Sequence, residues 1–156
     1  MASRSTPTAS PPSSPFDEVE RAAWGGIIAI HGRLMHEVEE DLRINSGLTH
    51  PEFEVLLRLY FAEDHRARIQ DLAADSILTP SGMSRLVSRL EERDFVIRHR
   101  AEEDGRGAYA ELTKRGQEAF ATAADHHISF VRGSFLSKYT RDELRTMGAF
   151  WERLDV

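Results

Sequence analysis

The sequence contains no cysteine, which excludes disulfide bonds, thiolate–zinc sites and cysteine-based redox sensing. It also lacks any apolar run near the ~18 residues that a membrane-spanning helix needs. Residues 1–15 are rich in Ser, Thr, Pro and Ala, carry the single charge of Arg4, and have no apolar stretch typical of a secretory signal. We therefore predict a disordered tail at residues 1–15, a cytoplasmic location and no membrane partner.

Motifs of catalysis are missing as well. The segment Thr79-Pro80-Ser81-Gly82 has neither the preceding glycine nor the preceding strand of a hydrolase nucleophile elbow. Gly105 and Gly107 do not lie before a helix, as the glycines of a phosphate-binding loop do. We therefore expect that the protein is not an enzyme and has no cofactor.

The seven histidines do not form a metal-binding pattern. Residues 36–40 begin like the helix motif of zinc proteases, but Glu40 stands where the second histidine is needed. His126 and His127 are adjacent, so on a helix they point about 100° apart and share one ion poorly. We predict no metal site and interpret these histidines as solvated or core residues.

The formal net charge of −6 is unfavourable for a nucleic-acid partner, but its distribution is uneven. Residues 66–115 hold ten basic and nine acidic side chains, which leaves ten basic and seventeen acidic side chains elsewhere. The acidic excess therefore lies outside the segment that contains the motifs described next.

Apolar residues spaced by three and four predict a long helix that begins after Pro15 and ends at residues 45–47. The stripe consists of Val19, Ala23, Ile27, Ile30, Leu34, Val38 and Leu42. Thr49 and Glu52 have the spacing of a capping box, which starts a second helix.

A helix-turn-helix follows this second helix. A short helix is expected to carry Ile69, Leu72, Ala73 and Ile77 on its apolar side. Thr79 then caps a helix at residues 80–93, with Pro80 in its first turn, where a missing N–H costs nothing. The apolar stripe of that helix is Met83, Leu86, Val87 and Leu90. Two helices joined by such a tight turn form a helix-turn-helix.

The apolar periodicity then changes to that of strands at residues 95–99 and 108–112, separated by turn residues at 103–107. Thr113 and Thr140 cap two final helices. The predicted fold is mainly α with a small β-hairpin wing, a winged helix-turn-helix with flanking dimerisation helices. We predict a single domain over residues 16–156, in which 48–112 form the winged helix-turn-helix lobe and 16–47 and 113–156 form the dimerisation helices.

The helix at residues 80–93 is the element expected to meet DNA, because the second helix of a helix-turn-helix enters the major groove. Its buried stripe leaves short polar and basic side chains on the opposite side. These are Ser81, Ser84, Arg85, Ser88 and Arg89, with Thr79 at the cap. Arginine can donate two hydrogen bonds to guanine, and serine allows a close approach to the backbone. An ordinary solvated helix face is the alternative interpretation.

The hairpin tip places Arg106 on a thin projection, where its charge suits the narrow, negative minor groove of A·T-rich DNA. Asp104 either orients the guanidinium or holds the turn. The alternative interpretation is an exposed hairpin with unremarkable charges. The position of the hairpin directly after a helix-turn-helix favours the interpretation that it binds DNA. The predicted partner is therefore double-stranded DNA.

Three short segments also carry a family resemblance: Leu90-Glu91-Glu92-Arg93 with Val96 and Arg98, then Asp104-Gly105-Arg106, then Leu112-Thr113-Lys114-Arg115-Gly116. Over about residues 17–155 the chain resembles the MarR (multiple antibiotic resistance regulator) family of transcription factors. Asp-x-Arg followed by Leu-Thr before a helix is the family's most specific motif. The resemblance places Arg106 in the minor groove and Ser84-Arg85 where the family commonly has Thr-Arg. Asp94 replaces the family's usual glycine, so we expect it to be left-handed.

The flanking helices carry large aromatic side chains, which fit an interface between two identical subunits. They are Trp24, Phe135, Phe150 and Trp151, and packing within one subunit is the alternative. The resemblance implies a homodimeric repressor that binds a near-palindromic operator and is released by a small, often phenolic or anionic, effector. Trp24, His31 and Tyr60 are candidate effector contacts, although they are also ordinary core residues in the alternative interpretation. The alternative function is a winged-helix protein-interaction module without DNA binding.

Overall fold

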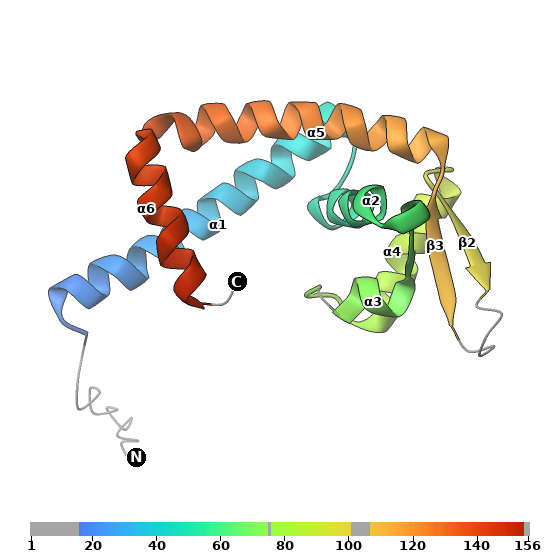
Figure 1. The fold of residues 1–156 in the computed structure, drawn as a ribbon, viewed down its shortest axis with the longest axis horizontal. Helices are drawn as coiled ribbons and strands as arrows, with labels where there is room; N and C mark the ends of the chain where they lie inside the picture. The colour runs from blue at the N-terminus through green and yellow to red at the C-terminus, as the bar shows by residue number, and fades with distance from the viewer. Residues whose placement is uncertain (1–15, 75, 101–106, 155–156) are drawn as a thin grey trace, which may run out of the picture. The chain divides into compact units, whose positions relative to one another are not determined.

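The computed structural model describes residues 16–74, 76–100 and 107–154. The predicted disordered tail lies outside these residues. The chain divides into two compact units, Met1–His36 and Glu37–Val156. The helices are α1 Glu18–Ser46, α2 His50–Phe61, α3 Ile69–Ala74, α4 Pro80–Glu92, α5 Lys114–Ser134 and α6 Arg141–Trp151, and the strands are β1 Arg66–Arg68, β2 Val96–Arg100 and β3 Ala108–Leu112 (Figure 1).

Helix α1 begins where Asp17 and Glu20 each accept a hydrogen bond from the other's backbone N–H, at 2.9 Å. It ends at Ser46, and Gly47 follows with a φ of 63°, in the left-handed region that glycine adopts at little cost. Of the predicted apolar stripe, only Val38 and Leu42 are buried. The N-terminal part of the stripe is exposed.

The core of the second unit lies where α2, α3 and α4 gather beside the sheet (Figure 1). The predicted capping box of α2 is confirmed, since the Thr49 side chain accepts from Glu52 N and the Glu52 carboxylate accepts from Thr49 N at 2.9 Å. The largest fully buried side chains of this core are Leu42, Leu48, Leu56, Leu59, Met83, Leu86, Val87, Leu90 and Val96.

The sheet has three antiparallel strands in the order β1-β3-β2, so the predicted hairpin is confirmed and extended by a third strand. Strand β1 was missed because it is only three residues long and has no apolar alternation. In the register of the sheet, Tyr109 of β3 lies opposite Arg68 of β1 on one side and opposite His99 of β2 on the other. These three residues share the outer face of the sheet, while Ala110 and Leu112 face the core.

The prediction that Ile77 lies on the apolar side of the short helix is wrong. Helix α3 ends at Ala74, and the Ile77 side chain is 98% exposed. The segment between α3 and α4 bends at this point, and Leu78 N donates to Ser76 Oγ at 3.1 Å. Ile69, Leu72 and Ala73 are buried as predicted.

The junction between α4, the sheet and α5 depends on one glycine. A Cβ at Gly116 would lie 2.1 Å from the carbonyl oxygen of Phe95, so only glycine fits there. Thr113 caps α5 as predicted, and its hydroxyl donates to Asp94 O at 2.7 Å. This contact joins the end of α4 to the start of α5.

The apolar side of helix α5 is buried only in the first half of the helix. Phe120 is buried, whereas His127 and Val131 are only half-buried, and Phe135 lies just beyond the helix end as its C-cap. Helix α6 begins with the predicted cap, Thr140, which forms a capping box with Glu143, and the helix contains no buried residue.

Candidate nucleic-acid interface

The start of α4 is fixed by a local cap. Thr79 Oγ1 accepts a hydrogen bond from Gly82 N at 3.2 Å and lies 3.2 Å from Ser81 Oγ, and Pro80 occupies the first turn. A Cβ at Gly82 would meet Thr79 Oγ1 at 3.3 Å, a tight contact. Gly82 thus leaves room for the capping hydroxyl.

The end of α4 has the hydrogen bonds of a Schellman motif. Asp94 N donates to Glu91 O at 2.9 Å, and Phe95 N donates to Leu90 O at 3.0 Å. Asp94 has a φ of 60°, so the predicted left-handed conformation is confirmed. The helix therefore has defined limits at both ends, which fixes the direction of its side chains.

The predicted polar side of α4 forms one continuous surface. With Met83, Leu86, Val87 and Leu90 buried as predicted, an open depression runs along the opposite side of the helix. Its lining is Ser81, Ser84, Arg85, Ser88, Arg89 and Glu92. All five side chains predicted within this helix thus contribute to the same surface.

Arg89 differs from Arg85 because a buried carboxylate lies beside it. Glu52, whose side chain is 7% exposed, places its two oxygens 3.5 Å from Arg89 Nε and 3.6 Å from Arg93 Nη1. Arg93 Nη1 also donates to Gly47 O at 3.1 Å. Glu52 was predicted only as a member of the capping box, but it also links α2 to the end of α4.

Asp104 and Arg106 lie outside the described residues, so the structure does not test their predicted roles. The strands on either side of them are described, and the Arg100–Ala108 pair is the one nearest to the loop. A hollow of about 370 Å³ joins this end of the hairpin to the starts of α3 and α4. Its lining is Ile69, Gln70, Pro80, Ser84, Arg98, Gly107 and Ala108. The loop-bearing end of the hairpin and the beginning of α4 are therefore neighbours.

Arg98 connects these two elements and was not predicted as a site residue. Its Nη2 donates to Ser84 O at 3.0 Å and to Ser88 Oγ at 3.1 Å. The sequence held one signal for it, the family resemblance, but no pattern indicates which helix the side chain contacts.

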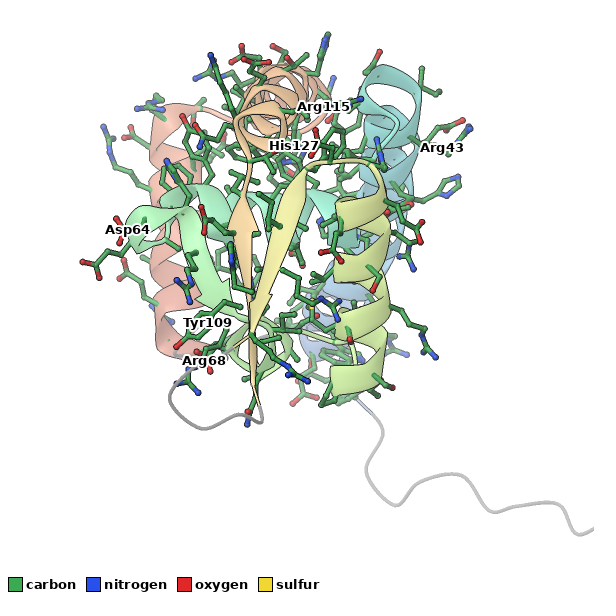
Figure 2. All side chains as sticks on the ribbon, turned by 90° about the vertical axis from the view of Figure 1, so that its right-hand side faces the viewer. Arg43, Asp64, Arg68, Tyr109, Arg115 and His127 are labelled. Carbon is green, nitrogen blue, oxygen red and sulfur yellow. The ribbon has the colours of Figure 1, made fainter. Side chains whose placement is uncertain are left out.

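The outer face of the sheet carries a second basic group. The guanidinium carbons of Arg66 and Arg68 lie 4.2 and 5.2 Å from the centre of the Tyr109 ring, and Arg68 Nε donates to the Tyr109 hydroxyl at 2.8 Å. Arg68 and Tyr109 lie together near one end of the sheet, and Arg115 lies beyond the opposite end (Figure 2).

An apolar cavity of about 410 Å³ lies between α2 and α5. Its lining includes Phe53, Tyr60, Phe61, Phe120 and His127. Burial and the charge of His50 lower the pKa of His127, and Asp41 opposes them. Tyr60, one of the three candidate effector residues, therefore lines a cavity. Trp24 and His31 belong to the other compact unit, where both side chains are exposed.

Two classes of site are not found in the described ranges. No group of three or more His, Asp or Glu side chains there is arranged to hold a metal ion. None of the helices in these ranges combines the length and apolarity that a membrane crossing requires.

Comparison with known proteins now adds to this geometry. The model of the MarR family matches residues 48–107, which include α2, α3, α4 and β2. The chain is similar to the HTH-type transcriptional repressor YetL of Bacillus subtilis (strain 168), with 29% identity over 128 residues, covering 80% of this chain and 76% of YetL. Over this part of its length, the chain is similar to the MarR family.

Solved structures of MarR-family regulators have the same fold. AbsC from Streptomyces coelicolor superposes with a TM-score of 0.84 at 29% identity, covering 92% of this chain and 96% of AbsC. Sco3205 from the same organism, solved in complex with DNA, gives a TM-score of 0.84 at 25% identity, covering 91% of this chain and 89% of its own. The predicted winged-helix fold is confirmed, and the relatives named here are transcriptional regulators.

Proposed function

We propose that this protein is a transcriptional regulator of the MarR family, which binds a specific DNA sequence as a homodimer and represses transcription. One observation carries the proposal: the hollow that joins Gly107 and Ala108 to Pro80 and Ser84. In this hollow, the described end of the hairpin lies beside the start of the predicted recognition helix. One duplex can then meet both, with α4 in the major groove and the wing in the adjacent minor groove.

Each candidate residue receives a role from its place on α4. Arg85, exposed at the middle of the polar surface, reads a base edge, and Ser81, Ser84 and Ser88 let the helix approach closely. Thr79 and the first turn lie where a helix N-terminus favours a phosphate. Arg89, beside Glu52, is held at the rim of the surface, where it contacts the DNA backbone.

The wing residues complete the interface. Arg106 enters the minor groove, and Asp104 holds the turn that presents it. In the sequence they lie between Arg100 and Gly107, and the position of Gly107 next to the start of α4 supports this role. Neither residue is among those that the structure describes, so the proposal for them rests on the hairpin and on the family motif.

A homodimer is supported by apolar side chains that remain uncovered in a single chain. Trp24, Phe150 and Trp151 are 55%, 49% and 44% exposed. Aromatic residues of this size are typical of subunit interfaces. Two α4 helices related by a two-fold axis would read half-sites about 34–36 Å apart on a near-palindromic operator.

Repression and effector release are the finer parts of the proposal. The name of YetL describes that relative as a repressor, which supports the same direction here. The cavity between α2 and α5 is large enough for a small aromatic effector, with Tyr60 as one wall. Roles for Trp24 and His31 in effector binding, and the cytoplasmic location, stay predictions.

The test is selection of a duplex from a random DNA library by the purified protein, followed by a salt titration of binding. We expect a two-fold symmetric consensus and an affinity that falls log-linearly with salt. A protein-interaction module without DNA binding would select no sequence. Recovery of no consensus, or of weak binding that ignores sequence, would reject the proposed function.

A further inference from the structure

Strand β2 is an edge strand, and α4 covers its free edge. Glu91 Oε1 accepts a hydrogen bond from the backbone N–H of Arg98 at 3.2 Å, which satisfies an edge group that would otherwise face solvent. Glu91 Oε2 lies 3.9 Å from Arg98 Nε. The base of the wing is thus attached to the last turns of α4 through both the backbone and the side chain of one residue.

The Arg98 side chain reaches further along α4 than this carboxylate. Nη2 donates to the carbonyl of Ser84 and to the hydroxyl of Ser88, at 3.0 and 3.1 Å. Ser84, Ser88 and Glu91 lie at i, i+4 and i+7, so Arg98 contacts one longitudinal row of the helix. Arg98 is 30% exposed, and its Nε is buried without a hydrogen bond to a described atom. The guanidinium therefore holds three parts of α4 at once.

These contacts restrict what the Ser88 hydroxyl can do. A hydroxyl has one donor and two acceptor positions. Since the guanidinium can only donate, Ser88 Oγ accepts from Arg98, and its O–H is directed elsewhere. Ser88 also lines the depression on the polar side of α4. One acceptor position and the O–H therefore remain, and the O–H can donate to a phosphate oxygen or to an acceptor such as guanine O6 or N7.

We propose that Arg98 is a positioning residue for DNA recognition: it sets the angle between the wing and α4 and makes Ser88 a hydrogen-bond donor toward the duplex. This inference rests on the proposed DNA-binding function. Arg98 acts through Ser84, Ser88 and Glu91. A lysine at this position could not replace it, because an ammonium group lacks the planar arrangement of donors.

Two simpler roles for Arg98 make different predictions. A direct phosphate contact would lower affinity for every sequence and reduce the slope of log affinity against log salt by about one when removed. A purely structural role would lower the melting temperature and leave the preference among sequences unchanged in the folded fraction. A positioning role changes sequence preference at an unchanged salt slope.

The experiment uses the full chain and two duplexes of equal length, one selected from a random library by the wild-type protein and one scrambled version. Binding is measured for wild type, Arg98→Gln, Arg98→Lys, Ser88→Ala and the Arg98→Gln/Ser88→Ala double variant. Arg43→Gln is the matched control for loss of one positive charge, since Arg43 is exposed in the last turn of α1. Melting temperatures are measured for all variants.

We expect Ser88→Ala to weaken binding of the selected duplex about two- to tenfold, the range for one neutral hydrogen bond. Arg98→Gln and Arg98→Lys should both lower the preference for the selected over the scrambled duplex about tenfold, with a salt slope equal to that of Arg43→Gln. In the Arg98→Gln background, the cost of Ser88→Ala should largely disappear, because the two residues act as one unit.

The outcomes separate this inference from the function on which it rests. If the wild-type protein selects no sequence, the proposed function fails and this inference fails with it. If the wild type selects a sequence, the inference alone is overturned by any of three results: an unchanged preference in Arg98→Gln, full activity of Arg98→Lys, or an equal cost of Ser88→Ala in both backgrounds. Should both Arg98 variants fail to fold, the Ser88→Ala variant decides. If it binds the selected duplex with unchanged affinity and unchanged sequence preference, the inference is overturned.

Discussion

The winged-helix lobe and the flanking helices use similar sequence patterns with different results. Both have apolar stripes at helical spacing, and both have a helix that begins with a Thr-x-x-Glu capping box. In α2 the stripe is buried, with Leu56 and Leu59 fully inaccessible, whereas α6 has no buried residue. The lobe thus completes its core within one chain, whereas the flanking helices leave large apolar side chains exposed.

This difference shows that a helical stripe predicts an apolar face but does not say what covers it. In the lobe, α2, α3, α4 and the sheet supply the cover, and the fully buried residues form one cluster. In the flanking helices, Trp24 and Trp151 remain about half exposed. We infer that the first region determines the stability of the chain and the second determines its assembly.

The largest effect should come from the core of the lobe. Leu56→Ala removes a side chain with no exposed surface and leaves a cavity, so we expect the free energy of unfolding to fall by about 2–5 kcal/mol. Urea denaturation measures it. Ile77→Ala is the control, because Ile77 is 98% exposed and should change stability by less than about 0.5 kcal/mol. A large effect of Ile77→Ala would contradict the position of this residue outside the core.

Arg85→Ala should separate recognition from stability within the lobe. Arg85 is exposed on the polar side of α4, so its loss should leave the melting temperature unchanged. Binding to the selected duplex should weaken by about 1–3 kcal/mol, with relaxed preference at one position in each half-site. Competition with duplexes changed at single positions measures this. A uniform loss across all sequences would instead identify Arg85 as a phosphate contact.

Trp151→Ala tests the flanking region. If a second chain covers this side chain, which is 44% exposed in the single chain, the dimer should be weakened by about 1–2 kcal/mol. Sedimentation equilibrium over a range of concentrations gives the dissociation constant. A matched substitution on the outer face of the sheet, Ile97→Ala, removes a residue of similar exposure and should leave that constant unchanged. Equal dimerisation of all three proteins would show that Trp151 lies outside the interface.

Features set by local chemistry were predictable from the sequence. Thr49, Thr79, Thr113 and Thr140 all cap helices as expected, because a capping side chain bonds to a backbone only three residues away. The left-handed Asp94 was also predictable, since few residue types tolerate that conformation after a helix.

Features set by contacts between distant segments were not predictable. The pairing of β1 with β3 involves residues more than forty positions apart and only three residues of β1. The contact of Arg98 with Ser84 and Ser88 depends on the angle between a strand and a helix. Gly116 was visible as part of a family motif, but the reason for it, the carbonyl of Phe95, became apparent only in the fold.

Because both regions contain a capping box, the same substitution, removal of the capping threonine, can be compared in the lobe and in the flanking helices. Thr49→Ala removes a cap whose partner, Glu52, is buried and also faces Arg89 and Arg93, so we expect a loss of about 1–2 kcal/mol in the free energy of unfolding. Thr140→Ala removes a cap whose Glu143 is fully exposed, and its effect should be smaller. Thermal and urea denaturation of both variants test the comparison. Equal losses would show that burial does not strengthen the first box.

The smallest effect should be a dependence of stability on pH that arises at His127, beside the cavity between α2 and α5. Burial, followed by the nearby charge of His50, lowers the pKa of His127 from its ordinary value of 6.5, and Asp41 opposes this shift. Below pH 6.5 the unfolded chain therefore binds this proton more readily than the folded chain does. The contribution of neutral His127 to the free energy of unfolding is therefore present above that pH. It is lost as the pH falls toward the pKa of His127 in the folded chain.

His127→Gln should flatten this part of the stability profile, whereas His126→Gln, at the exposed neighbouring position, should preserve its slope. Urea denaturation between pH 5 and pH 8, compared for the three proteins, measures this difference, and parallel profiles would remove His127 as its source.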